Sequence, residues 1–153
     1  MWEWETAVVV VTDDAQRVLL VHQSYGHRFF GLPGGVLDKG ETAREAAVRE
    51  VLEETGLAVT VGDAVAVEDL EYPGSGQRYR AHVFRAESMR GTPAVQDAEE
   101  ISDVAWFDLD QLPVPLTPSA EAALGRIRRM RALQALGAMA DRGDFDDVPV
   151  KRS

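Results

Sequence analysis

The chain of 153 residues contains no cysteine. Disulfide bonds, thiolate zinc sites and cysteine nucleophiles are therefore all excluded. Long apolar runs are also missing, and none approaches the roughly 18 residues that a membrane-spanning helix needs. The first eleven residues, MWEWETAVVVV, lack the basic stretch that opens a secretory signal. We therefore expect a soluble protein of the cytoplasm.

Positive charge is scarce as well. The chain has 16 Lys and Arg residues against 26 Asp and Glu residues, and its formal net charge is -10. Such a balance argues against binding a nucleic-acid backbone or an anionic membrane by bulk electrostatics. If the protein handles an anionic substrate, the local positive charge has to come from a metal ion or from arginine.

Length and composition fit one compact domain. Hydrophobic residues make up 45% of the chain, and neither an internal repeat nor a low-complexity tract is present. A chain of this size can bury roughly 70% of the surface that it exposes when unfolded. We predict a single domain over residues 1–140 and a charged tail over residues 141–153.

Apolar runs and turn residues predict several strands and two helices. Residues 6–11 and 18–21 are aliphatic and are expected to form two strands joined through a turn, while Gly and Pro make residues 31–40 a structured loop. The later expectations are a strand, a turn and a strand over 57–71, a strand over 78–86, a long loop over 87–102, a strand over 104–108 and a helix from 119 to about 140. This order indicates a mixed α and β class with a mixed central sheet.

The first helix is defined by signals at its own ends. Thr42 and Glu45 have the spacing of a capping box, and Gly56 stands where a left-handed C-terminal cap is expected. The helix is therefore predicted over residues 43–55.

Helical periodicity of about 100° per residue divides this helix into an apolar and an acidic face. The residues assigned to the apolar, core-facing side are Val48, Val51, Leu52 and Thr55. Those assigned to the opposite side are Glu50, Glu53 and Glu54, flanked by Ala46 and Ala47. Acids at this spacing repel one another unless a cation lies among them. A divalent metal ion is the obvious candidate.

The same acids belong to a longer pattern, G-x5-E-x7-R-E-U-x-E-E-x-G-U, where U is aliphatic. It is filled by Gly35, Glu41, Arg49, Glu50, Val51, Glu53, Glu54, Gly56 and Leu57. At about 7% per specified residue, a chance match in this chain is on the order of one in ten million. The segment resembles the Nudix box at every specified position, so the chain is similar to the Nudix hydrolases.

The resemblance implies an α/β/α sandwich that uses Mg²⁺ or Mn²⁺ to hydrolyse a nucleoside diphosphate linked to another moiety. Chemistry agrees, because Mg²⁺ prefers hard carboxylate oxygens, and metal ions beside a pyrophosphate neutralise its charge and generate a hydroxide nucleophile. The metal ligands that the resemblance implies are Gly35, through its carbonyl, and Glu41, Glu50, Glu53 and Glu54. Arg49 is expected to hold these carboxylates in place.

Family members also recruit a further glutamate, as base or ligand, from the loop before the last strand. Glu99 and Glu100 occupy that loop here. Glu100, six positions before Trp106, is our first choice. The implied catalytic set is therefore Glu53, Glu54, Glu100 and Arg49.

The substrate is read from the turn after the box. Relatives acting on ADP-ribose tend to carry a proline about fifteen or sixteen residues past the box, and those acting on diadenosine polyphosphates a tyrosine at nearly the same place. This chain has both, as Tyr72 and Pro73. We favour ADP-ribose or a nucleoside-diphosphate sugar on this basis. The residues predicted to contact substrate are Arg28, Tyr72, Arg78 and Arg80, and those able to stack on a base are Tyr25, Phe29 and Tyr79.

Two alternative functions stay open. One is a MutT-like pyrophosphohydrolase that removes oxidised or non-standard nucleoside triphosphates. The other is a non-catalytic Nudix module that senses a nucleotide. A homodimer is also possible, and the basic cluster on the last helix fits either a solvated face or a dimer rim. That cluster comprises Arg126, Arg128, Arg129 and Arg131, on a helix whose expected inward stripe is Leu124, Ile127, Leu133 or Met130, and Leu136.

Overall fold

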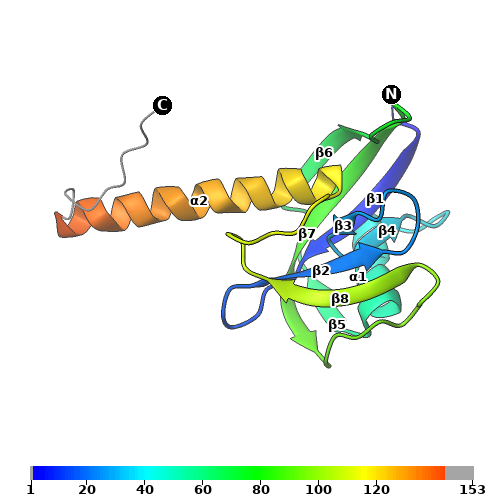
Figure 1. Cartoon of the computed structure of the whole chain (residues 1–153), viewed down its shortest axis with the longest axis horizontal. Coiled ribbons are helices and arrows are strands. Elements are labelled where there is room, and N and C mark those ends of the chain that lie inside the picture. The colour runs from blue at the N-terminus through cyan, green and yellow to red at the C-terminus, as the bar shows by residue number, and fades with distance from the viewer. Residues whose placement is uncertain (1, 144–153) are drawn as a thin grey trace.

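The computed structural model describes residues 2–143 (Figure 1). Its strands are β1 (Trp4–Val10), β2 (Val18–Gln23), β3 (Phe30–Gly31), β4 (Gly34–Val36), β5 (Ala58–Val61), β6 (Ala66–Glu71), β7 (Arg78–Arg90) and β8 (Ile101–Phe107). Its helices are α1 (Ala43–Thr55), between β4 and β5, and α2 (Pro118–Arg142), which follows β8. None of the helices in this part of the chain combines the length and the apolar character needed to cross a membrane.

The strands form two sheets. A five-stranded sheet has the order β4-β1-β7-β5, with β6 also pairing with β7, and a three-stranded sheet has the order β3-β2-β8. Strands β1 and β7 run parallel, whereas β1 and β4, β5 and β7, and β6 and β7 run antiparallel. The predicted α/β class with a mixed central sheet is confirmed.

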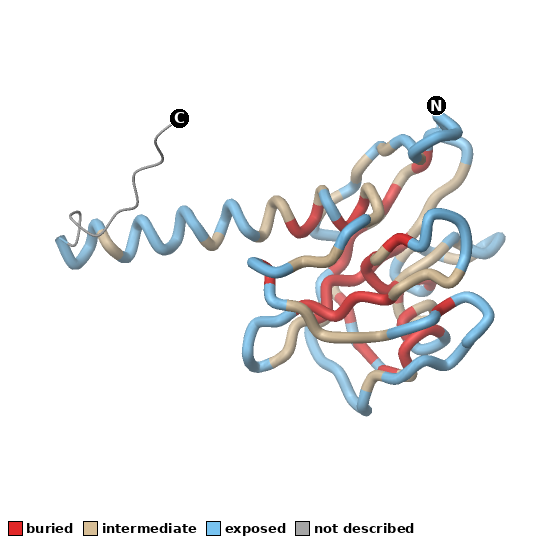
Figure 2. Tube along the Cα trace, viewed as in Figure 1, coloured by how far each residue is buried: buried red, intermediate tan, exposed pale blue. Residues whose placement is uncertain are grey.

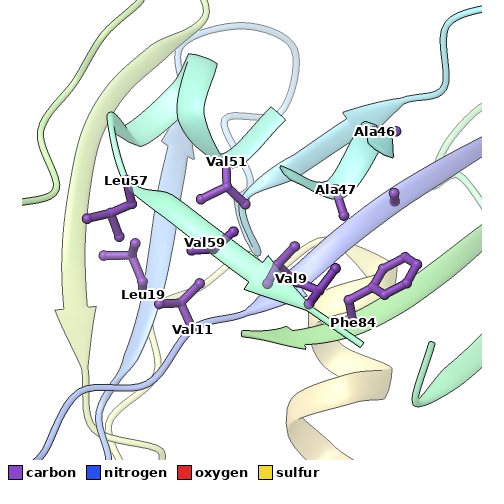
Figure 3. Packing of buried hydrophobic residues seen from close by; sticks show 11 residues of the cluster. Val9, Val11, Leu19, Ala46, Ala47, Val51, Leu57, Val59 and Phe84 are labelled. Carbon is purple, nitrogen blue, oxygen red and sulfur yellow. The ribbon is translucent and has the colours of Figure 1, made fainter. Parts of the chain in front are cut away.

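Strand β1 and the residue after it contribute side chains to two hydrophobic cores, because side chains along a strand alternate between its faces. Val9 and Val11 point to the core that α1 covers, where Val51, Leu57 and Phe84 join them (Figure 3). The opposite face of β1 contributes to a second core against the beginning of α2, which contains Val8, Val10, Leu20, Val83, Ala120 and Leu124. The larger sheet is therefore packed on both sides, and α1 is fixed against it.

The sequence predicted six of the eight strands, and several details differ. Strands β1 and β2 do not form a simple hairpin in one sheet, although a bond from the Leu19 amide to the Val11 carbonyl, 2.9 Å long, links their adjoining ends. The loop predicted over 31–40 contains the two short strands β3 and β4. The long loop predicted over 87–102 was wrong at both ends, because β7 continues to Arg90 and β8 begins at Ile101.

Helix α1 has the predicted bounds, and of its predicted core-facing residues Val51 and Thr55 are buried and Val48 packs against the core, whereas the prediction for Leu52 was wrong. Ala46 and Ala47, expected to flank the acidic side, are fully buried in the core, and Leu52 is 51% exposed. Small alanines let the helix backbone lie close to β1 and β4, so the core-facing side is rotated toward the acids. As a result, Glu54 is itself buried.

Helix α2 extends beyond the body of the protein. Its buried residues lie within the first two turns, and the later turns are mostly exposed (Figure 2). The expected inward stripe is therefore wrong past Ile127, since Met130, Leu133 and Leu136 are exposed. The helix includes Asp141 and Arg142, which the sequence assigned to the tail. The rest of the predicted tail, from residue 144, lies outside the described residues.

Candidate active site

The predicted caps set the register of α1. The Glu45 amide donates to the Thr42 hydroxyl at 3.1 Å, and the Thr42 amide donates back to the Glu45 carboxylate at 3.0 Å. At the other end, Gly56 adopts φ 78°, a left-handed conformation that a glycine takes without a steric penalty. The helix thus begins and ends where these local contacts fix it, which determines where each box carboxylate points.

Arg49 binds three of the box carboxylates at once. Its Nε and Nη2 donate to the two oxygens of Glu41 at 2.7 and 2.8 Å. Its Nη1 donates to Glu50 at 3.0 Å and to Glu53 at 3.1 Å, and Nη2 also reaches the Val36 carbonyl at 3.3 Å. Such a bidentate pair with further charge-assisted bonds holds each acid in a defined place.

The acids bound by Arg49 differ in environment. The hydrogen bonds from Arg49, with one from the Asp38 amide, hold the pKa of Glu41 down at about 2. Glu53 is the most open of the three, with a side chain 56% exposed. Glu50 is largely covered, and burial raises its pKa despite the bond from Arg49. The site therefore joins a carboxylate fixed by arginine to one that can face an incoming ligand.

Glu54 is the buried acid of the site. Its side chain has a single hydrogen bond in this structure, from the Gly34 amide at 2.7 Å. Burial, together with the charges of Glu50, Glu100 and Glu53, raises the pKa of Glu54 to about 8 against the opposing effect of that bond. A carboxylate that is buried beside other acids is the kind of group that a bound cation stabilises.

The two glycines before the helix give the acids their close contacts with β4. A Cβ atom on Gly34 would lie 2.2 Å from the Ala7 carbonyl oxygen, and one on Gly35 would lie 2.6 Å from the Glu50 carboxyl carbon. Neither position has room for a side chain. The backbone of β4 consequently lies directly against Glu50, where the resemblance placed a metal-binding carbonyl.

The loop before β8 carries the two loop glutamates, Glu99 and Glu100. The Ser24 amide donates to the Glu100 carbonyl at 2.9 Å, and the Ser24 hydroxyl donates to the Glu99 carbonyl. These two bonds attach the loop before β8 to the end of β2. The charge of Glu100 raises the pKa of both Glu50 and Glu54, so Glu100 lies within electrostatic reach of them. Nothing in the sequence pattern pointed to Ser24.

Tyr25, Phe29 and Tyr72 form a group of aromatic side chains, here called the aromatic wall. Burial and the charge of Glu54 raise the pKa of the Tyr25 hydroxyl, so Tyr25 lies within electrostatic reach of the carboxylates. Phe29 packs edge-on against Tyr72 with ring centroids 5.9 Å apart, and against His27 at 5.5 Å. The loop after β2 and the turn before β7 therefore lie side by side, with Tyr72 packed against Phe29.

The three arginines predicted to contact substrate lie in different surroundings. Arg28 lies in the loop after β2, has φ 52°, and donates its amide to the Tyr25 carbonyl at 3.0 Å. Arg80 is occupied elsewhere, by Asp69 at 2.8 Å and by the ring of Trp2 at 3.5 Å. Arg78 opens β7 opposite Glu71 of β6. Arg28 therefore lies in the same loop as Tyr25, and Arg80 pairs with Asp69 within the sheet.

The donors present suit a hard divalent cation. Across residues 2–143, no three Asp, Glu or His side chains are arranged as a complete ligand set. Mg²⁺ does not need one, because it is usually held by one or two carboxylates while water and substrate phosphates complete its shell. The buried oxygens of Glu50 and Glu54 beside the β4 backbone fit that requirement.

This fold and this arrangement of acids define a Nudix domain. The family model described as NUDIX domain matches residues 3–129, and the chain belongs to this family. It is accordingly a Nudix hydrolase, an enzyme that cleaves pyrophosphate bonds. The predicted membership of the Nudix hydrolase family is confirmed.

Within this family, the chain is similar to several individual proteins. The chain is 38% identical over 108 residues to the oxidized purine nucleoside triphosphate hydrolase of Mus musculus, covering 69% of this chain and 67% of that protein. It is 34% identical over 113 residues to the putative 8-oxo-dGTP diphosphatase of Bacillus subtilis, covering 74% and 72%. The crystal structure of a MutT NUDIX hydrolase from Burkholderia pseudomallei superposes with a TM-score of 0.73 at 31% identity, covering 80% and 95%.

Proposed function

We propose that this protein is a MutT-like pyrophosphohydrolase that acts on nucleoside triphosphates, with oxidised purine nucleotides as the substrate class. The observation that carries the proposal is the similarity, over about 70% of the chain, to two proteins named for oxidised purine nucleotides. The complete box, from Gly35 to Leu57, supports catalysis. A non-catalytic sensing module has no comparable support.

These relatives favour the MutT-like alternative over ADP-ribose or a nucleoside-diphosphate sugar. The sequence argument for ADP-ribose used Pro73 in the turn after β6. In the structure that turn packs through Tyr72 against Phe29, so its residues serve to support the loop after β2. A proline in a supporting turn does not require an ADP-ribose ligand.

We infer that Glu50, Glu53 and Glu54, with the Gly35 carbonyl, hold Mg²⁺ or Mn²⁺. When bound, the metal neutralises phosphate charge and lowers the pKa of a coordinated water. Glu41 is saturated by Arg49 and the Asp38 amide, so in this proposal it acts on the metal through water or by fixing Arg49. Arg49 keeps the other carboxylates from repelling one another before the metal binds.

Glu100 is proposed as the base. In the hydrolysis, a water oxygen forms a bond to one phosphorus, the bridging P–O bond breaks, and the leaving phosphate takes the electron pair. The proton lost by the water passes to the Glu100 carboxylate, which lies within electrostatic reach of Glu50 and Glu54. No covalent intermediate on the protein is needed, which agrees with the absence of cysteine.

The test is a substrate panel on the purified full chain at alkaline pH, with Mg²⁺ and separately with Mn²⁺. 8-oxo-dGTP, dGTP, ADP-ribose and UDP-glucose are compared by kcat/KM. We expect 8-oxo-dGTP to give the highest value, with release of the nucleoside monophosphate and pyrophosphate. Hydrolysis in ¹⁸O-labelled water then shows which phosphorus is attacked. Higher kcat/KM on ADP-ribose or UDP-glucose would overturn the substrate proposal and restore the alternative.

A further inference from the structure

The outer half of α2, residues 130–142, is the largest feature that hydrolysis does not use. The family match ends at residue 129, whereas the helix continues to Arg142. Figures 1 and 2 show these later turns extending away from both sheets with almost all of their residues exposed. At about 1.5 Å per residue, this part of the helix is roughly 20 Å long. Within residues 2–143, no strand or helix packs along it.

This outer half is apolar rather than polar. Residues 132–140 contain no charged side chain, and only Gln134 among them is polar. Leu133 is 68% exposed, Met130 54% and Leu136 44%. A helix that is apolar on most of its circumference is normally buried, and an isolated helix of this length is marginal in water. We therefore expect this segment to be buried against another molecule.

Charges at its two ends indicate what covers it. Arg131 precedes the uncharged run, and Asp141 follows it with Arg142 next in the chain. If two copies of the helix pair antiparallel about Leu136, Arg131 of each copy lies beside the partner's Asp141. The two helix dipoles also point in opposite directions in that arrangement, which is the favourable orientation for neighbouring helices. A parallel pair would bring equal charges together, so the sequence is self-complementary only in the antiparallel direction.

The rest of the protein fits the same occupant. Arg128, Arg129 and Arg131 concentrate positive charge at the base of the outer half, on a chain with a net charge of -10, while Arg126 pairs with Glu68. A second copy is thus attracted to this basic segment. A hollow of about 640 Å³ lies there, lined by Leu109, Asp110, Gly125, Arg128, Arg129, Arg131 and Ala132. The end of the partner helix would enter near this hollow.

We propose that the outer half of α2 is a dimerisation surface, on which a second copy of this chain packs its own α2 antiparallel about a two-fold axis near Leu136. Such an interface is isologous, because the same residues contribute from both copies. Ala132, Ala135, Gly137 and Ala138 leave room for close approach of the two helices. The site acids lie on α1 and are not part of this surface.

The first test measures the mass of the full chain by light scattering and by sedimentation from low to high micromolar concentration. We expect a species of twice the 16.8 kDa of one chain. The double variant Leu133→Lys/Leu136→Lys should be monomeric, with unchanged helix content, because both side chains are exposed in the single chain. Val67→Lys, at a 52% exposed position on β6, is the matched control and should remain dimeric. A monomeric parent, or a dimer that survives the double variant, would overturn the proposal.

The second test is a charge exchange across the axis. Arg131→Glu and Asp141→Arg should each weaken the dimer about tenfold, because each places equal charges together twice. The combination Arg131→Glu/Asp141→Arg should recover the parent dissociation constant, because the opposite pairs are restored in exchanged positions. A combined variant that is weaker than either single variant would exclude antiparallel pairing.

Discussion

The two sides of the active site are held in different ways. The helix side consists of Glu50, Glu53 and Glu54 on α1, fixed by caps within 14 residues and by Arg49 on the same helix. The loop side consists of Glu100 and Tyr25, and it is held by Ser24, which binds a carbonyl 75 residues away. The helix side thus forms from local sequence, whereas the loop side depends on long-range contacts. We therefore expect the metal chemistry to reside in the first and the tuning of substrate and rate in the second.

The largest expected effect is on the helix side. Glu53→Gln should reduce kcat with Mg²⁺ by about a thousandfold or more, because it removes a ligand charge and keeps the shape of the side chain. The fold should be unaffected, since the Glu53 side chain is 56% exposed and bonds only to Arg49. The measurements are kcat and the thermal midpoint. Glu121→Gln, an exposed acid on α2, is the control, and near-parent activity of Glu53→Gln would remove Glu53 from the ligand set.

Glu54 should show a second property of the helix side, a conflict between stability and activity. Its pKa is raised from the ordinary 4.5 of a glutamate to about 8 in the folded protein, so ionisation in the fold is unfavourable without a cation. The sign follows from linkage: the contribution of a raised carboxyl pKa is fully present below pH 4.5 and is lost as pH rises through about 8. The metal-free protein should therefore become less stable across this interval.

Glu54→Gln should remove that loss, because the amide stays neutral and its oxygen still accepts from the Gly34 amide. At pH 8 without metal, Tm should exceed that of the parent by several degrees, at about 2–4 °C per kcal/mol for a chain of this size. Activity should fall about as far as in Glu53→Gln. Added Mg²⁺ should raise the Tm of the parent and leave the variant unchanged. A Tm below the parent at pH 8 would contradict this account of Glu54.

On the loop side, Glu100→Gln should lower kcat by about 10²-fold, the range of a general base, with little change in metal affinity. Metal affinity is read from the Mg²⁺ concentration that gives half-maximal activity. Glu99→Gln is the matched control and should retain most of the parent kcat. If the loss appears in Glu99→Gln instead, the two neighbours exchange roles and the loop side keeps its function.

The different origins of the two sides explain what the sequence could predict. The bounds of α1, its capping box and its Gly56 cap were all confirmed, because the residues that determine them are neighbours in the chain. Helical periodicity alone did not show that Ala46 and Ala47 would face the core while Leu52 is exposed. That choice depends on where β4 presses its glycines against the helix, which is a tertiary contact.

The loop side was predicted only in outline. Glu100 was named from the resemblance, but the residue that attaches its loop, Ser24, has no recognisable pattern, since its hydroxyl binds a backbone carbonyl that any residue provides. The same limit applies to Arg80. Its side chain was free to be a phosphate ligand on sequence grounds, and only the pairing of β6 with β7 brings Asp69 opposite it.

The smallest expected effect is that of Ser24, and it separates positioning of Glu100 from general support of the fold. Ser24→Ala removes the hydroxyl bond to the Glu99 carbonyl but keeps the backbone bond to Glu100, so kcat should fall only about three- to tenfold with KM nearly unchanged. Ser102→Ala is the matched control, because its hydroxyl also links the β8 region to β2, at 3.2 Å from the His22 carbonyl, without holding the loop. Its kcat should equal that of the parent.

The decisive measurement is the double variant Ser24→Ala/Glu100→Gln. If Ser24 acts by placing the Glu100 carboxylate, its hydroxyl has nothing left to position once that carboxylate is gone, and the double variant should have the kcat of Glu100→Gln alone. If Ser24 only supports the fold, its three- to tenfold loss should multiply that of Glu100→Gln. Multiplying losses would mean that the loop side of the site is held by contacts other than this serine, and the contrast with the Arg49-centred helix side would have to rest on Tyr25 and the aromatic wall.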